Sequence, residues 1–134
     1  MPDNTPPALT DFDHWLAAEY AAGEKSGFTA FVILVKITKK DVEPLCSTYL
    51  HVIGLEVDWG EVCNLFTASG MKWDAAVFFA RRDPRHNGPL DNPSARLYLL
   101  DQEARVAEDR MVINEGHFFD VWGRRMQVEE TVLQ

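Results

Sequence analysis

The sequence predicts an α+β fold, a small mixed or antiparallel sheet of about four strands with three to four helices packed on it in a single domain. The first observation is the stretch Phe28–Ile37, which is the richest in β-branched and aromatic residues. Thr29 and Lys36 lie in this short run, so it is too short and too polar for a bilayer-spanning helix. Because it is apolar on both side-chain faces, we expect helices to cover both faces of its sheet.

Composition and charge narrow the class of protein. The chain has 134 residues, 46% of them hydrophobic, which is enough for one domain with its own core. A formal charge of −8 disfavours nucleic acid and anionic membranes as partners. The N-terminus lacks the pattern of a signal peptide, and Cys46 and Cys63 fit a reducing compartment, so we expect a cytoplasmic protein with free thiols.

Two segments carry helix signals at both ends. Thr10 or Asp11 can cap a helix that ends at Gly23. Asp58, with Glu61 three residues later, can cap another that ends near residue 70. Both segments have an apolar stripe at helical spacing, so we expect them to lie on the sheet.

A further helix is predicted after the polar residues 38–41. Pro44 would occupy its first turn, where a missing N–H costs nothing, and Gly54 would end it. Residues 55–57 would form a short extended link. The apolar face of this helix would consist of Leu45, Tyr49, Val52 and Ile53.

A second strand is predicted for Ala76–Arg81, where Val77, Phe78 and Phe79 favour β-structure. It runs directly into Asp83–Pro93, which contains three prolines and a glycine and must be a loop. Loops of this length inside a compact domain are commonly either disordered or functional, and we expect this one to be functional.

The segment Ala95–Ile113 supports two interpretations. Asn92 as a cap, Pro93 in the first turn and an apolar stripe indicate a helix; the stripe comprises Leu97, Leu100, Ala104, Ala107 and Met111. A hairpin would instead supply strands, and without them the sheet would have only two, which is marginal in water. We therefore predict the hairpin.

The end of the domain is predicted to be a short helix from Glu115, capped by Asn114, with Phe118, Phe119 and Trp122 buried or available for a homodimer. Residues 1–9 should form a flexible arm, residues 10–126 the domain and residues 127–134 a frayed tail. We expect the core to centre on Phe31, Ile33, Val35, Leu50, Phe66, Val77 and Phe79.

Two clusters of polar residues are candidate binding sites. The first, at the start of the loop, is the densest group of cations in an acidic chain and could grip a carboxylate or phosphate; it comprises Arg81, Arg82, Asp83, Arg85 and His86. In the second, His117 and Asp120 would share a face of the predicted C-terminal helix.

No nucleotide-binding or hydrolase motif is present, and the spacing of Cys46, His51 and Cys63 does not suit a metal ion, so no cofactor or metal is expected. The sequence therefore favours a non-catalytic module that binds a protein partner, or its own copy, through aromatic and arginine side chains. The alternative is a small ligand-binding domain or enzyme with a pocket beside the 83–93 loop.

Overall fold

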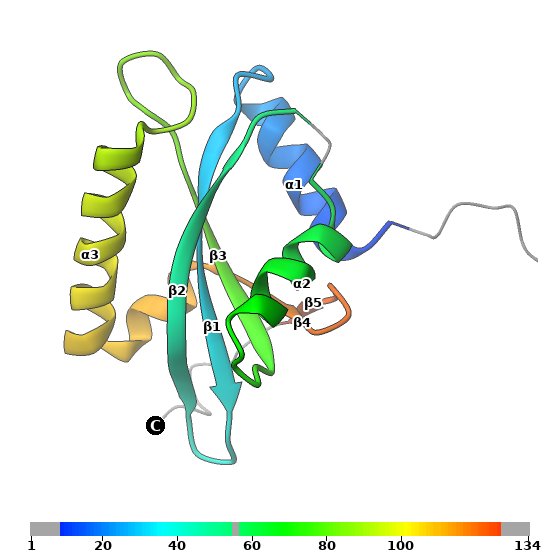
Figure 1. The fold of residues 1–134 in the computed structure, drawn as a ribbon, viewed down its shortest axis with the longest axis vertical. Helices are drawn as coiled ribbons and strands as arrows, with labels where there is room; N and C mark the ends of the chain where they lie inside the picture. The colour runs from blue at the N-terminus through cyan, green and yellow to red at the C-terminus, as the bar shows by residue number, and fades with distance from the viewer. Residues whose placement is uncertain (1–8, 55–56, 127–134) are drawn as a thin grey trace, which may run out of the picture.

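The computed structural model describes residues 9–54 and 57–126, which form one antiparallel sheet with helices on both faces (Figure 1). The elements are α1 (Asp11–Ala22), β1 (Phe28–Ile37), β2 (Val42–Val52), α2 (Trp59–Ala68), β3 (Ala75–Arg81), α3 (Asn92–Glu108), the 3₁₀ helix η1 (Arg110–Glu115), β4 (His117–Asp120) and β5 (Arg125–Met126). The strand order is β2-β1-β3-β4-β5, with every neighbouring pair antiparallel. The predicted α+β class is confirmed, with five strands where about four were expected.

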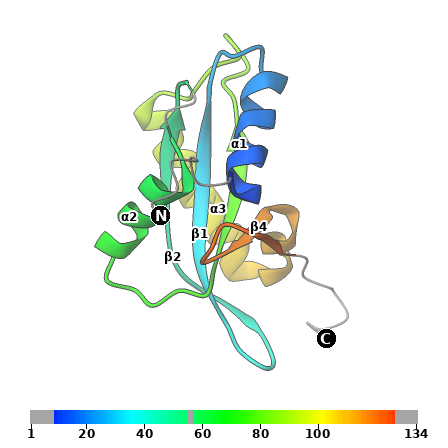
Figure 2. The ribbon, with the colours of Figure 1, turned by 90° about the vertical axis from the view of Figure 1, so that its right-hand side faces the viewer.

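The predicted central strand is β1, which pairs with β2 on one side and β3 on the other. Its first eight residues are all buried, because alternate side chains enter two separate cores. Ala30, Val32 and Leu34 face α1 and α2, whereas Phe31, Ile33 and Val35 face α3 and η1. Figure 2, turned from Figure 1, shows α1 lying along one face of the sheet with α3 behind it.

The two helices with clear terminal signals are confirmed. At the start of α1, the Thr10 hydroxyl accepts a hydrogen bond from the Asp13 N–H, while the Asp13 carboxylate accepts one from the Thr10 N–H. At the start of α2, the Asp58 carboxylate accepts a hydrogen bond from the Glu61 N–H. Both helices bury aromatic side chains in one cluster; its rings are Phe12, Trp15, Phe28, Trp59, Phe66, Phe78 and Phe119.

The helix predicted over residues 42–53 is wrong, because this segment is the edge strand β2. Pro44 is tolerated there because, on the outer side of an edge strand, no neighbouring strand needs a hydrogen bond from a main-chain N–H. Leu45 forms a bulge: Pro44 lies opposite Val35 and Cys46 opposite Leu34, so Leu45 has no partner. Pairing with β1 outweighed the helical spacing of Leu45, Tyr49, Val52 and Ile53, which had suggested a helix.

The hairpin predicted for residues 95–113 is also wrong, since α3 covers most of that segment. Asp91 caps the helix and Pro93 lies in its first turn, so the preceding loop ends two residues before its predicted limit. The buried residues are Ala95, Gln102 and Val106. The apolar stripe that had indicated a helix is therefore not its inner face: Leu97 is 68% and Leu100 is 62% exposed.

The predicted C-terminal helix is the strand β4, followed by a turn and β5. Phe118 and Phe119 are both buried, and because they are neighbours in a strand they enter opposite cores. Trp122 lies in the turn and is 66% exposed. Two of the three aromatic residues proposed for a dimer surface are thus inside the domain.

The predicted core is confirmed at six positions, and the seventh, Leu50, is half-buried against the aromatic cluster. The predicted arm and tail lie outside the described residues, apart from the exposed Leu9; residues 55–56 of the predicted link also lie outside them. In the described part of the chain, no helix has the length and apolarity to cross a membrane.

Candidate functional site

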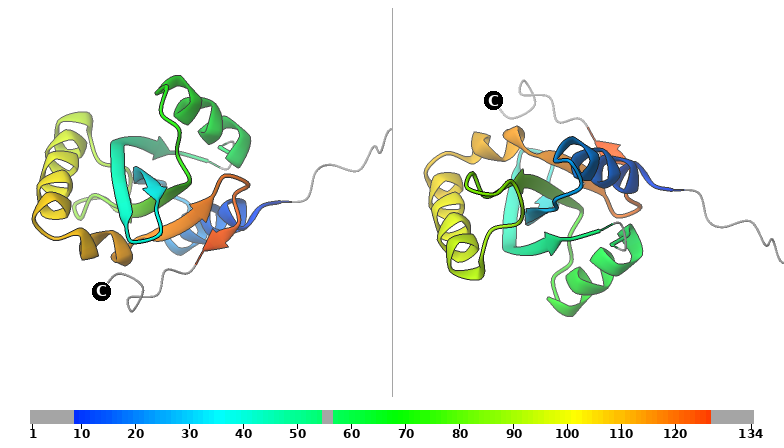
Figure 3. Two further views of the ribbon diagram at one scale, coloured as in Figure 1. Left: turned by 90° about the horizontal axis from the view of Figure 1, so that it is seen from below. Right: turned by 90° about the horizontal axis from the view of Figure 1, so that it is seen from above.

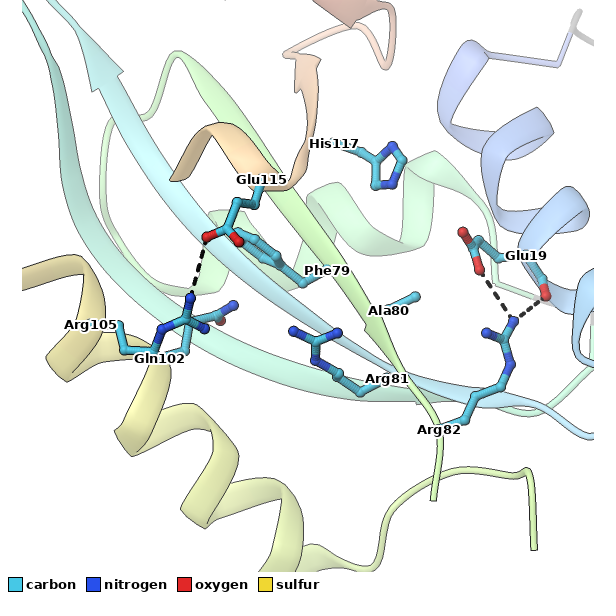
Figure 4. A pocket seen from close by; sticks show the side chains of 9 residues that line it. All are labelled: Glu19, Phe79, Ala80, Arg81, Arg82, Gln102, Arg105, Glu115 and His117. Carbon is cyan, nitrogen blue, oxygen red and sulfur yellow. Dashed lines mark hydrogen bonds and ion pairs between the residues drawn. The ribbon is translucent and has the colours of Figure 1, made fainter. Parts of the chain in front are cut away.

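A polar cavity lies where the sheet is incomplete. β4 pairs with β3 only as far as His117 opposite Phe78, so among the described strands residues 79–81 of β3 pair with β1 alone. A cavity of about 370 Å³ fills this gap (Figure 4). We name it the arginine pocket, and its lining comes from five segments: Glu19, Phe79, Ala80, Arg81, Arg82, Gln102, Arg105, Glu115 and His117.

Gly116 sets the wall of the pocket, because it lets the chain pass from η1 into β4 close against the sheet. A Cβ atom at this position would lie 2.5 Å from Val77 Cγ1 and 2.8 Å from Phe79 Cζ. Only glycine fits these distances without displacement of the neighbours. The backbone therefore approaches β3 here and brings Glu115 and His117 to the pocket.

The charges in the pocket are unevenly paired. Arg82 binds the carboxylate of Glu19 at 3.2 Å, and Arg105 binds that of Glu115 at 3.3 Å. Arg81 lies between these two pairs (Figure 4), and its guanidinium has no hydrogen bond or ion pair with any of the described residues. Three guanidinium groups thus face two carboxylates, which leaves the pocket positive in an acidic protein.

His117 adds a neutral donor. Its Nδ1 lies 3.1 Å from the guanidinium of Arg125, which is always protonated, so Nδ1 accepts and the ring proton is on Nε2. Burial, followed by the charge of Arg125, lowers the pKa of His117, while Glu19 acts in the opposite direction. The ring also packs against Trp15, with their centroids 5.2 Å apart. At neutral pH His117 therefore carries one N–H and adds no positive charge to those of the three arginines.

Unpaired polar atoms are concentrated at this pocket. Among the described residues, three buried side-chain polar atoms have no partner: Gln102 Oε1, Arg82 Nε and Trp15 Nε1. The first two belong to residues that line the pocket, and the third belongs to the indole against His117. Since buried polar groups are nearly always paired, the packing around this pocket leaves hydrogen-bonding capacity unused, which is uncommon in a folded domain.

The structure divides the predicted loop cluster. Arg81 and Arg82 line the pocket, whereas Asp83, Arg85 and His86 form a separate cluster. Asp83 is only 2% exposed and accepts hydrogen bonds from Arg85 N at 2.8 Å, Nε at 3.2 Å and Nη2 at 3.1 Å. Nε2 of His86 lies 3.3 Å from the same carboxylate. These contacts shape the loop, and the predicted binding role of these three residues remains a prediction.

Asp120 does not join His117, contrary to the prediction. Both residues lie on β4, and positions three apart on a strand point to opposite faces. The carboxylate of Asp120 instead accepts hydrogen bonds from the N–H groups of Trp122 and Arg124, and from Nε of Arg124. It stabilises the turn between β4 and β5.

Four residues of the pocket were missed in the sequence: Glu19, Gln102, Arg105 and Glu115. Glu19 lies within the first predicted helix, and Gln102 and Arg105 lie within the predicted hairpin. No local spacing connects them, because they come from α1, α3 and η1. Only the packing of these elements around the open part of β3 brings them together.

A second cluster of polar side chains is arranged like a catalytic triad, with a hydroxyl, an imidazole and an orienting amide in sequence. The Thr29 hydroxyl lies 2.9 Å from His51 Nδ1, and His51 Nε2 lies 2.8 Å from Asn92 Oδ1. Thr29 is fully buried, however, and its oxygen already accepts a hydrogen bond from the Leu90 N–H. A nucleophile must reach its substrate, so this group fastens the start of α3 to the strands instead.

The cysteines do not form a metal site with these residues. Cys46 and Cys63 are free and half-buried, and burial raises the pKa of each thiol. Within residues 9–54 and 57–126, no group of three or more His, Cys, Asp or Glu side chains is placed to hold a metal ion.

Comparisons of the chain with protein-family models, with curated proteins and with solved structures gave no match.

Proposed function

We propose that the protein is a non-catalytic binding module whose arginine pocket receives an anionic group, a carboxylate or phosphate, from an acidic segment of a partner protein. The observation that carries the proposal is Arg81, a guanidinium between two ion pairs with no partner of its own among the described residues. A guanidinium offers paired N–H donors that match the oxygens of a carboxylate or phosphate.

The neighbours of Arg81 support this role. Glu19 and Glu115 are each held against an arginine, so they fix the positions of Arg82 and Arg105 around the pocket. His117 also lines the pocket, and its Nε2–H is a further donor for an anion. The open backbone of residues 79–81 lies beside these groups.

A second candidate is a small anionic molecule as the ligand. The cavity volume of about 370 Å³ favours it, because pockets for small molecules occupy roughly 300–1,000 Å³. A free ligand would bind the same Arg81 guanidinium. The two candidates therefore share the anionic group and differ in what carries it, a partner protein or a small molecule.

The test is a titration of the ¹⁵N-labelled protein with three probes: inorganic phosphate, succinate and a short peptide with several glutamates. We expect the amide signals around Arg81 and His117 to shift, with an affinity that falls as salt is added. Arg81→Ala should abolish these shifts. Lys39→Ala is the matched control, because it removes one exposed positive charge from the turn between β1 and β2.

The outcomes separate the candidates. Tighter binding of the peptide than of succinate or phosphate supports a protein partner, and the reverse order supports a small molecule. The proposal is contradicted if none of the three probes shifts the pocket signals, or if Lys39→Ala weakens binding as much as Arg81→Ala.

A further inference from the structure

The edge of the sheet formed by β2 carries an unprotected segment. Among the described strands β2 pairs only with β1, so no described strand covers its other side. Figure 3 shows β2 lying between α3 and α2. Edge strands are usually protected against pairing by charges, prolines or bulges. β2 has all three devices in its first half, at Glu43, Pro44 and the Leu45 bulge. The second half, Cys46–Val52, has no charged residue and no proline.

Apolar cavities flank this edge on both faces. On the α2 face a cavity of about 410 Å³ includes Leu34, Leu65 and Phe66 in its lining. On the α3 face a smaller one of about 200 Å³ includes Ile33 and Val106. An added strand would place its alternate side chains over these two cavities, as in other cases of strand addition.

We propose that this edge binds the same edge of a second copy, so that two β2 strands pair antiparallel about a twofold axis at Tyr49 and form a continuous ten-stranded sheet. An uncharged segment can pair with itself without like-charge repulsion. In this register Ser47 lies opposite His51 of the partner subunit, and the two Tyr49 side chains lie opposite each other.

The position of α3 agrees with this axis. α3 contacts β1 through Tyr98 and Phe31, whose ring centroids are 6.2 Å apart, and contacts β2 through a hydrogen bond from Ser47 to Glu103. The helix therefore lies over this pair of strands. With strands about 4.8 Å apart, the two copies of α3 would be about 10 Å apart, a normal distance for packed helices.

The charges on α3 of one copy are complementary to those on α3 of the second copy across the same twofold axis. Arg96 and Glu103 are seven residues apart, so they share the side of the helix that borders β2, with Leu100 between them. In an antiparallel pair of helices, Arg96 meets the partner's Glu103 and Glu103 meets the partner's Arg96. The midpoint between Arg96 and Glu103 lies about 5 Å along the helix from Glu103. Because Glu103 lies beside Ser47, the same distance along β2 is roughly one and a half residues from Ser47 toward the end of the strand. This is the level of Thr48 and Tyr49, where the uncharged segment has its centre.

The test is sedimentation equilibrium of the full chain and its charge variants, with circular dichroism to verify folding. We expect a dimer for the unchanged protein. Arg96→Glu and Glu103→Arg should each weaken dimer formation about tenfold or more. Each change puts like charges opposite each other at both of the symmetry-related contacts between the two helices. The double variant R96E/E103R should restore the dimer, since the opposite charges then meet again. Asp101→Arg is the matched control, because residue 101 lies on the other side of α3 and should leave the mass unchanged.

A crosslink tests the register independently of these charges. In a background with Cys46→Ser and Cys63→Ser, Tyr49→Cys should form a disulfide-linked dimer under mild oxidation, because residues opposite each other at an antiparallel axis are close enough. Lys39→Cys should not. A monomeric mass for the unchanged protein overturns the proposal, and so do a dimer that neither charge reversal weakens, a folded double variant that stays monomeric, and an absent Tyr49→Cys crosslink.

Discussion

Arg82, the residue after β3, donates hydrogen bonds to both the main-chain oxygen and the carboxylate of Glu19 in the last turns of α1. Its guanidinium also lies 5.5 Å from the ring centroid of Phe28, the first residue of β1. One side chain thus joins a helix to two strands. Arg82 is three-quarters buried, which distinguishes it from the exposed Arg81 next to it.

This contact predicts that neighbouring arginines have different effects. Arg82→Ala should lower the free energy of unfolding by roughly 1–3 kcal/mol, because it removes hydrogen bonds from a charged group in a partly buried place. Arg81→Ala should change it by less than about 0.5 kcal/mol while removing anion binding. Urea unfolding of both variants measures the difference. Equal midpoints for the two variants would contradict the structural role of Arg82.

Phe31 should be among the residues most important for stability. It is 2% exposed and has its ring near those of Tyr49 and Tyr98, at 6.1 and 6.2 Å between centroids. Phe31→Ala should reduce the free energy of unfolding by about 3–5 kcal/mol, since it removes a buried ring and leaves a cavity. Leu97→Ala, on the exposed side of α3, is the control and should change it little. A loss below about 1 kcal/mol in urea unfolding would show that this position is not central to the core.

Asp83 should make the loop after β3 sensitive to acid. Hydrogen bonds from the side chain and main chain of Arg85 hold the pKa of Asp83 below its ordinary value. The native state therefore binds this proton less readily than the unfolded chain, whose aspartates titrate near about pH 3.9. The stabilisation is complete above that pH and is lost as the pH falls through the lower pKa of the folded state.

The measurement is the urea midpoint of the unchanged protein and of Asp83→Asn over the acid range. The difference in stability between the two proteins should be largest near neutral pH and should shrink in acid. A difference that stays constant as the pH falls would exclude Asp83 as the titrating group.

His117 should have a lower pKa than an ordinary histidine. Because its pKa is lowered in the folded protein, the unfolded chain binds the proton more readily, and this residue reduces stability as the pH falls below about 6.5. Arg125→Gln removes the positive charge beside Nδ1 and should raise the pKa of His117, although burial still acts. Proton NMR of the ring gives both values. An unchanged or lower pKa in the variant would contradict the contact with Arg125.

The sequence by itself determined the elements whose signals are local. The β-rich run Phe28–Ile37 became the doubly covered strand β1, Thr10 and Asp58 capped α1 and α2, and the apolar run before the loop became β3. In each case the residues that stabilise the element lie within it or next to it. That is why composition and capping were sufficient for these parts of the fold.

Only the tertiary structure decided β2, β4 and the pocket. It also decided between the two interpretations of residues 95–113: the local signals for a helix were correct, and the strands that the hairpin was meant to supply are β2, β4 and β5. The helical spacing in residues 42–53 was outweighed by main-chain hydrogen bonds to β1, and β4 is a strand because β3 offers it a partner. Arg81 and Arg82 were recognised as candidate binding residues, but Gln102 and Glu115 reach the same cavity from distant segments. No single segment of sequence encodes that arrangement, since it depends on where β4 stops along β3 and on how α1, α3 and η1 pack around the gap.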